Sequence, residues 1–466
     1  MRTLDRLSPQ RVILTITLAA IPMVTAQAQT ADEHDVAEIR SMLDALRDDY
    51  EQRIADLEQR LQRAEARAAD AEVMAEDAAI AAQNAASASA PPVVTTTSPS
   101  AFNPGIGAVL VGTIGHLDND PEGVEIPGFQ LGGEPNPGDG LSLGESEINF
   151  NGSIDDKFFG NLTFALASEE GAINVELEEA WLQTTALPAG LQLTAGRFFS
   201  GFGYLNAFHR HADDFVDRPL PYRAFLGGQF LDDGLQLRWL APTDHYLEFG
   251  GELLRGDKFP GGDQSDGMDA FSTFVKTGGD FGTDHSWKAG LSYLRSDVLG
   301  RTGGHGHGHE EAEGDDHEEM EGFFGDSDLY GVDLVYKWAP NGNARQRNLK
   351  LQAEYFWRDE KGLFDGLNYS GQQDGWYAQA NYKFAPNWSV GYRYDQLEAD
   401  NRGVDGTELE PGSYTPRRNS LIMQWHNSEY SRLRLQYIID RSTEVDDDQL
   451  YLQYVMSFGA HRAHSF

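Results

Sequence analysis

The sequence has no cysteine, few basic residues and no long hydrophobic run after its amino end. Without cysteine, the chain has no disulfide, no thiolate metal site and no cysteine nucleophile. Lys and Arg total 36 against 74 Asp and Glu, and this net charge of -38 argues against a nucleic-acid partner. The mean hydropathy of -0.48 excludes a bundle of membrane helices, each of which needs about 20 apolar residues. A membrane β-barrel remains open, because alternation dilutes its apolar residues.

The first 28 residues have the features of a cleaved export signal. Arg2, Arg6 and Arg11 precede an apolar stretch at 12–24, and Ala26-Gln27-Ala28 supplies the small-x-small pattern that a signal peptidase recognises. The apolar stretch is too short for a stable transmembrane helix. We therefore expect residues 1–28 to be a signal peptide that directs the chain out of the cytoplasm.

Residues 29–85 are predicted to form an α-helical coiled coil in the periplasm. Between Ala31 and Ala85 the chain has no Gly or Pro, and apolar residues recur at steps of three and four. Because such a narrow stripe needs partner helices, we expect a homo-oligomer, with a trimer preferred. The alternative is a single solvated helix or a helix lying on the cell wall. Residues 86–102 are small, polar and proline-bearing, which is typical of a linker.

From residue 103 to 466 the hydrophobic period changes to two. In the stretch 349–358, Leu351, Ala353 and Tyr355 alternate with polar residues, and the stretches 376–384 and 431–441 show the same pattern. Segments of about 10 residues with one apolar and one polar face fit strands that have lipid outside and water inside. Aromatic residues at segment ends suit an interfacial girdle: Trp338, Trp357 and Phe384.

We count about 16 such strands, which predicts an all-β, antiparallel transmembrane barrel. The predicted strands begin near residues 106, 143, 157, 173, 190, 233, 245, 269, 285, 328, 347, 373, 387, 419, 431 and 448. Connections after even-numbered strands are mostly short, whereas most after odd-numbered strands are long. Outer-membrane barrels have this asymmetry, with short periplasmic turns and long external loops.

The architecture of signal peptide, coiled coil, linker, barrel and terminal Phe466 resembles that of phosphate-selective trimeric porins. No ladder of Lys and Arg is apparent, so phosphate is not carried over as substrate. Four segments are similar to a group of zinc-regulated, so-called TonB-dependent-receptor-like outer-membrane proteins. They are Gly144-Glu145-Ser146-Glu147, Glu178-Glu179-Ala180-Trp181, His209-Arg210-His211-Ala212-Asp213 and the terminal residues 459–466.

The connection at 200–232 corresponds to the external loop that narrows the lumen of general porins. The resemblance therefore implies a pore constriction made by His209, His211, Asp213, Asp214, Asp217, Arg218 and Arg223. Two imidazoles beside two carboxylates suit a divalent ion of the zinc class, so His209, His211, Asp213 and Asp214 are candidate metal ligands. The alternative is a loop that His and Asp hydrogen bonds pin to the barrel wall.

The connection at 305–321 is the second candidate metal site. It has four His, eight carboxylates and no Lys or Arg in 17 residues. We expect it to capture zinc, copper or nickel weakly on the cell exterior. The alternative is a solvated acidic loop that binds such ions incidentally. The candidate ligands are His305, His307, His309, His317, Glu310, Glu311, Asp315 and Asp316.

These features predict a porin-type channel that favours cations and is involved in divalent metal passage or capture, with zinc first. No cofactor is expected to be required, although a bound zinc ion fits the candidate ligands. Catalytic motifs such as a nucleophile elbow or a zinc-protease helix are absent from the sequence, so we expect no enzyme. Two alternatives are a closed barrel that anchors a metal-buffering surface loop and a general porin for small organic solutes.

Overall fold

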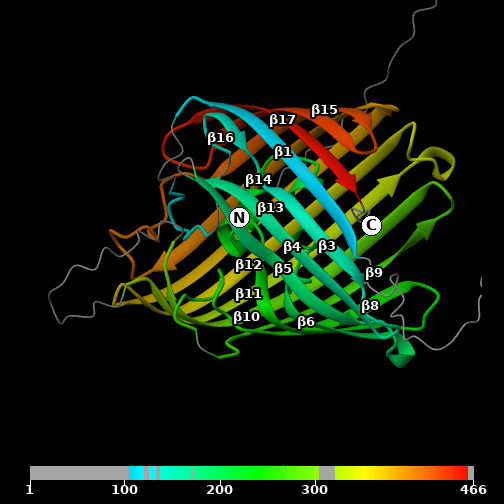
Figure 1. Ribbon diagram of the computed structural model, residues 1–466. Coiled ribbons are helices and arrows are strands. Elements are labelled where there is room, and N and C mark those ends of the chain that lie inside the picture. The colour runs from blue at the N-terminus through cyan, green and yellow to red at the C-terminus, as the bar shows by residue number, and fades with distance from the viewer. Residues whose placement is uncertain are drawn as a thin grey trace, which may run out of the picture. The chain divides into compact units, whose positions relative to one another are not determined.

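The computed structural model in Figure 1 describes residues 104–119, 125–132, 137–169, 172–265, 267–303 and 321–459, with the side chains of 167–173 left out. The predicted signal peptide at 1–28, coiled coil at 29–85, linker at 86–102 and carboxy-terminal residues 460–466 lie outside the described residues. So do all eight candidate ligands between His305 and His317. Within the described residues, no helix has the length and apolar character needed to cross a membrane.

Seventeen strand segments form one closed antiparallel sheet, in which β1 pairs with β17 (Figure 1). Segments β2 and β3 both pair with β1, with a slip of one residue between them, so they are two parts of one strand and the barrel has 16 strands. The predicted all-β, antiparallel barrel of about 16 strands is therefore confirmed. The segments are β1 (Gly105–Leu117), β2 (Gly140–Leu143), β3 (Ser146–Ser153), β4 (Phe158–Glu169), β5 (Ala172–Thr184), β6 (Leu191–Phe199), β7 (Leu231–Leu240), β8 (Tyr246–Leu254), β9 (Ala270–Phe281), β10 (His285–Arg301), β11 (Phe323–Trp338), β12 (Asn348–Phe364), β13 (Leu367–Ala385), β14 (Trp388–Arg402), β15 (Arg417–Ser428), β16 (Ser431–Arg441) and β17 (Asp447–Gly459).

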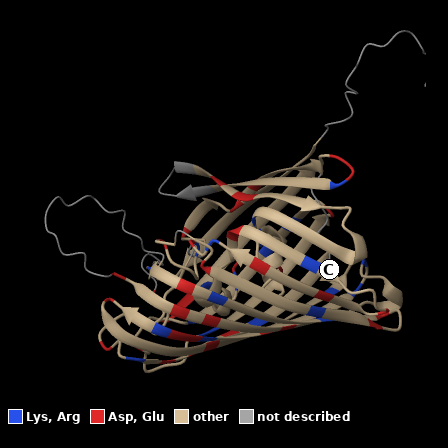
Figure 2. Cartoon of the chain, turned by 90° about the horizontal axis from the view of Figure 1, so that it is seen from below, with Lys and Arg blue, Asp and Glu red and all other residues tan. Residues whose placement is uncertain are grey.

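The alternation along the strands places apolar residues outside and polar residues inside. Leu291 and Leu421 on the outer face are 60% and 58% exposed, whereas the charged Asp395 and Arg418 on the inner face are 0% exposed. A water-soluble domain buries its apolar side chains, so this inverted pattern is typical of a barrel surrounded by lipid. Figure 2 shows charged residues interspersed with long uncharged stretches of strand.

Aromatic residues gather at two levels of the outer face. Tyr330 and Trp357 stack with ring centroids 4.7 Å apart near the middle of the long strands β11 and β12. Trp388 and Trp425 lie 6.5 Å apart, next to the short turns. These two levels are the positions expected for aromatic girdles at the membrane surfaces.

The strand ends differ from the prediction most at β12 and β13. A connection up to residue 373 was expected, but β13 begins at Leu367 and only Asp365 and Gly366 separate it from β12. Both turn residues have positive φ, 47° and 76°, as in the tight hairpin turns that Asp-Gly favours. The long strands thus extend through the stretch between the two predicted strands.

Short helical segments complete the described part. η1 (Pro188–Gly190) and η4 (Pro340–Gly342) lie in connections at the end of the barrel with short turns, and η2 (Leu205–Ala207), η3 (Arg210–Ala212) and α2 (Leu220–Leu226) lie between β6 and β7. All seven residues of α2 are buried. The residues from 200 to 230, here called the lumen segment, therefore belong to the interior of the barrel.

Candidate functional site

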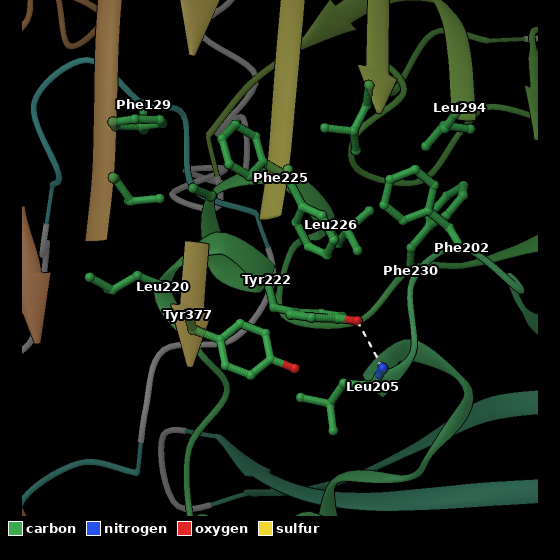
Figure 3. Packing of buried hydrophobic residues seen from close by; sticks show 14 of the residues in the cluster. Phe129, Phe202, Leu205, Leu220, Tyr222, Phe225, Leu226, Phe230, Leu294 and Tyr377 are labelled. Atoms are coloured by element: carbon green, nitrogen blue, oxygen red, sulfur yellow. Dashed lines mark hydrogen bonds between the residues drawn. The ribbon is translucent and has the colours of Figure 1, made fainter. Parts of the chain in front are cut away.

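Near its start, the lumen segment meets a buried carboxylate of the barrel wall. Glu354 of β12 accepts hydrogen bonds from the backbone nitrogens of Tyr204 at 2.8 Å and Leu205 at 3.1 Å. The Tyr222 hydroxyl also donates to Glu354, at 3.0 Å, and accepts from the Leu205 nitrogen at 3.0 Å (Figure 3). A carboxylate that is 2% exposed needs such donors, because an unpaired buried charge is costly. Glu354 therefore fixes where η2 starts.

An apolar cluster then packs the middle of the lumen segment against the wall and against residues 125–132. Phe225 and Leu226 of α2 are 0% exposed, and Phe225 meets Phe129 edge-to-face at 5.9 Å between ring centroids. Leu294 of β10 and Tyr377 of β13 face the same cluster (Figure 3). This packing makes the lumen segment part of the folded core of the barrel.

Ion pairs fix the stretch between η3 and α2. The carboxylate of Asp217 lies 2.7 Å from Arg393 of β14 and 2.9 Å from Arg418 of β15. Burial alone would raise the pKa of Asp217, but these two guanidinium groups hold it at about 2. Asp217 therefore stays ionised at neutral pH, and its charge stabilises both arginines.

Two imidazoles of the lumen segment meet three carboxylates of the wall. Nδ1 of His209 lies 3.1 Å from Glu147 of β3 and 3.3 Å from Glu178 of β5, and its Nε2 lies 3.2 Å from Glu179 of β5. Nδ1 of His211 lies 2.7 Å from the other oxygen of Glu147. Burial would lower the pKa of His209, but these carboxylates raise it well above its ordinary value. We call these five residues the His/Glu cluster.

Irregularities in two strands aim these carboxylates inward. In β5 the pairing passes from Glu179 directly to Leu177, so Glu178 is an extra residue and both neighbouring glutamates are buried. The break between β2 and β3 is a second one-residue slip, just before Glu147. Such bulges re-aim side chains, and here they bring more carboxylates into the lumen than simple alternation allows.

Two cavities open on the sides of the lumen segment. One, of about 1040 Å³, is lined by His209 and Glu179 and reaches His245 in the β7–β8 turn. The other, of about 700 Å³, is lined by His211 and reaches Tyr430 in the β15–β16 turn. Tyr204 and Phe208 line both. The His/Glu cluster is therefore next to space that leads toward the end of the barrel with short turns.

The remaining predicted site residues of this connection lie apart from the imidazoles' partners. Asp213 pairs with Arg218 at 2.7 Å, and Asp214 pairs with Lys350 at 2.9 Å. Burial and the nearby Arg418 lower the pKa of Arg223, which lies in α2. The seven predicted constriction residues thus share the lumen segment, but Asp213 and Asp214 do not join His209 and His211 in one ligand set.

Sequence reasoning missed Glu147, Glu178 and Glu179 as partners of the imidazoles. They stand in two of the segments that carried the family resemblance, and His209 and His211 stand in a third, so three of those segments meet at one place. The available signal was the adjacent pair of glutamates within a strand. An acidic pair breaks the alternation and indicates a bulge facing water.

Comparison with known proteins finds a close relative in sequence. A protein of Aquifex aeolicus (strain VF5), described as an uncharacterized protein, is 30% identical over 415 residues, which cover 80% of this chain and 82% of the relative. No family model matches the chain.

Three solved structures are similar to the described fold. The anion-selective porin of Comamonas acidovorans has a TM-score of 0.48 at 10% identity and covers 76% of this chain and 99% of its own. OprB of Pseudomonas putida has a TM-score of 0.46 at 14% identity, and the match covers 76% of this chain and 94% of OprB. OmpT of Vibrio cholerae, an outer-membrane protein, has a TM-score of 0.46 at 10% identity, and the match covers 76% of this chain and 99% of OmpT. By its sequence, the chain belongs to the same family as the Aquifex aeolicus protein.

Proposed function

We propose that the protein is a bacterial outer-membrane channel that favours cations and passes divalent metal ions, zinc first. The closed 16-strand barrel, with its exposed apolar belt and two aromatic levels, supports a location in lipid. The coiled coil at 29–85 would join copies into a trimer in the periplasm, and the loop at 305–321 would gather ions outside. The role is non-catalytic.

The observation that carries the proposal is the His/Glu cluster at the lumen segment. Three glutamates and two imidazoles meet where the segment crosses the lumen, beside the cavity of about 1040 Å³. Carboxylates at a narrow point within a low-dielectric wall concentrate cations and repel anions. Imidazole and carboxylate donors add a preference for ions of the zinc class.

The test is the reversal potential of the purified protein in a planar bilayer under a potassium chloride gradient, followed by zinc chloride. We expect a cation-selective potential for the wild type. The double variant Glu178→Gln, Glu179→Gln should lower the cation-to-anion permeability ratio at least about twofold, because it removes two lumen charges.

The matched control is Asp326→Asn with Asp359→Asn, which removes two carboxylates from the outer face of β11 and β12. These residues line a surface cavity outside the lumen, so their loss should leave the ratio unchanged. An anion-selective wild type, or a control that shifts the ratio as much as the lumen variant, contradicts the proposal.

One observation favours the closed barrel as a second candidate. The apolar cluster around α2 packs against strands on several sides of the lumen, with Phe202, Phe225 and Phe356 each 0% exposed. A barrel filled in this way would anchor a metal-binding surface loop without conducting. The same bilayer experiment separates the two candidates, since a closed barrel gives no steady current at any salt concentration.

A further inference from the structure

The nitrogen and oxygen atoms of Glu147, His209 and His211 are arranged as the ligands of one ion. One nitrogen from each imidazole and one carboxylate oxygen all lie within 4.8 Å of one another. Nδ1 of His209 and Nδ1 of His211 approach the two different oxygens of Glu147, at 3.1 and 2.7 Å. Neighbouring ligands of a tetrahedral ion with bonds of about 2.0–2.1 Å lie about 3.3 Å apart. The spacing of these atoms is therefore close to that of a zinc shell.

Glu178 and Glu179 occupy supporting positions around these three residues. Glu178 is 5% exposed, and its Oε2 lies 3.3 Å from Nδ1 of His209. That oxygen is placed to complete the ligand set. Glu179 lies on the opposite nitrogen of His209, at 3.2 Å. A carboxylate on the second nitrogen is how proteins orient a metal-ligating imidazole.

The charge of the cluster also favours a cation. Three carboxyl groups, those of Glu147, Glu178 and Glu179, face only two imidazoles, so acidic groups outnumber basic ones in the cluster. Glu147 and Glu178 are only 3% and 5% exposed, and a buried carboxylate needs a cation or a hydrogen-bond donor beside it.

The backbone that carries the imidazoles is held independently of the cluster. Arg432 of β16 donates to the carbonyl oxygens of His211 and Asp213, and Arg434 donates to that of Asp213 at 2.7 Å. His209 and His211 flank Arg210 in η3, and their rings stack with centroids 5.6 Å apart. The donor atoms are therefore preorganised, which lowers the entropy that an ion must remove on binding.

We propose that Glu147, His209, His211 and Glu178 bind one resident divalent metal ion of the zinc class, which fastens the lumen segment to β3 and β5. Glu179 is a positioning residue that orients the His209 ring. Calcium and magnesium are excluded as preferred occupants, because they take shells of oxygen atoms. The proposal extends the proposed function by assigning a fixed ion, distinct from the ions that pass, to the same cluster.

The experiment measures zinc binding to the full chain purified in detergent, in a background with His305, His307, His309 and His317 changed to Gln. That background removes the imidazoles of the external loop. Competition with a chromophoric chelator should find one tight equivalent of zinc. X-ray absorption at the zinc edge should show two imidazole ligands with oxygen ligands at about 2.0–2.2 Å.

Two variants and one control assign the site. His211→Gln and Glu147→Gln should weaken zinc binding by at least about 10- to 100-fold, whereas the control His116→Gln, an exposed residue beside Asp139, should not. Zinc should also protect the lumen segment of the background protein from trypsin. Folding of each variant is checked by the shift in electrophoretic mobility on heating. Absence of a tight equivalent, a metal-edge spectrum without imidazole, or unchanged affinity in both folded variants overturns the inference.

These outcomes are separate from those of the channel experiment. If the barrel binds one zinc ion but gives an anion-selective current, the resident metal site is supported and the proposed cation passage is contradicted. If the barrel is cation-selective but binds no zinc ion tightly, the channel proposal is supported and the resident metal site is contradicted.

Discussion

Individual charges inside the barrel differ widely in what they contribute. Asp217 touches Arg393 and Arg418, and all three side chains are at most 1% exposed. By contrast, Asp400 and Arg402 form a pair at 3.4 Å with side chains that are 64% and 76% exposed. Burial strengthens the consequence of losing one partner, whereas water and salt screen the exposed pair. The stability of the folded chain therefore depends mainly on its few buried ion pairs and little on its exposed ones.

Asp217→Asn should destabilise the folded barrel by about 3–5 kcal/mol, because two buried guanidinium groups lose their anion. The folded-state pKa of about 2 lies below the ordinary 3.8. The contribution of ionised Asp217 to the stability of the fold is therefore complete at pH values above its ordinary pKa. That contribution is lost as the pH falls through about 2. Denaturant unfolding should show a constant difference in the free energy of unfolding between wild type and variant from pH 8 to about 5. This difference should become smaller toward pH 2.

The matched control for Asp217 is Asp400→Asn, which should unfold like the wild type at every pH. The account of Asp217 would be contradicted if the difference in unfolding free energy disappears already near pH 6. It would also be contradicted if the control is destabilised as much as Asp217→Asn, because Asp217 would then not stabilise the two arginines as described.

At the scale of elements, strand positions were predictable and the interior was not. All sixteen strands could be assigned from alternation, because each has one face in lipid and one toward the lumen. The acidic residues of β5 could not be placed, because a one-residue bulge at Glu178 changes the face of every residue beyond it. The path of the lumen segment depends on contacts such as Tyr204 with Glu354, which are 150 residues apart in sequence.

The middle of the lumen segment is held by apolar packing against the barrel wall and against residues 125–132. Phe225→Ala leaves a cavity beside Phe129 and Phe356, at a cost of about 3–5 kcal/mol. Because α2 makes no strand pairs, we expect the barrel to persist while the segment loosens. Limited trypsin digestion should cut the variant faster near Arg210 and Arg218.

Phe158→Ala is the control for Phe225, since Phe158 is an exposed side chain on the outer face of β4. It should digest like the wild type. Equal digestion of all three proteins would mean that the apolar cluster does not hold the segment in place.

At the scale of the whole molecule, the lumen segment contacts the wall through side chains but takes no part in the strand pairing. Phe199 at the end of β6 pairs directly with Leu231 at the start of β7. A short turn can therefore replace most of the segment without disturbing the register of the sheet. The sequence supported the barrel, its strand number and the ends that carry long connections, since these follow from local patterns. How far the lumen is filled depends on long-range packing, which local patterns do not encode.

The most direct test of the account is single-channel conductance with the lumen segment shortened. Residues 204–227 are replaced by a brief Gly-Ser turn, and strand content is checked by circular dichroism. We predict a barrel that keeps its strand content, although it is less stable than the wild type. Its conductance should rise several-fold and its cation preference should fall, because the segment fills part of the lumen and completes the His/Glu cluster. An intact barrel with wild-type conductance and selectivity would contradict the claim that this segment controls passage.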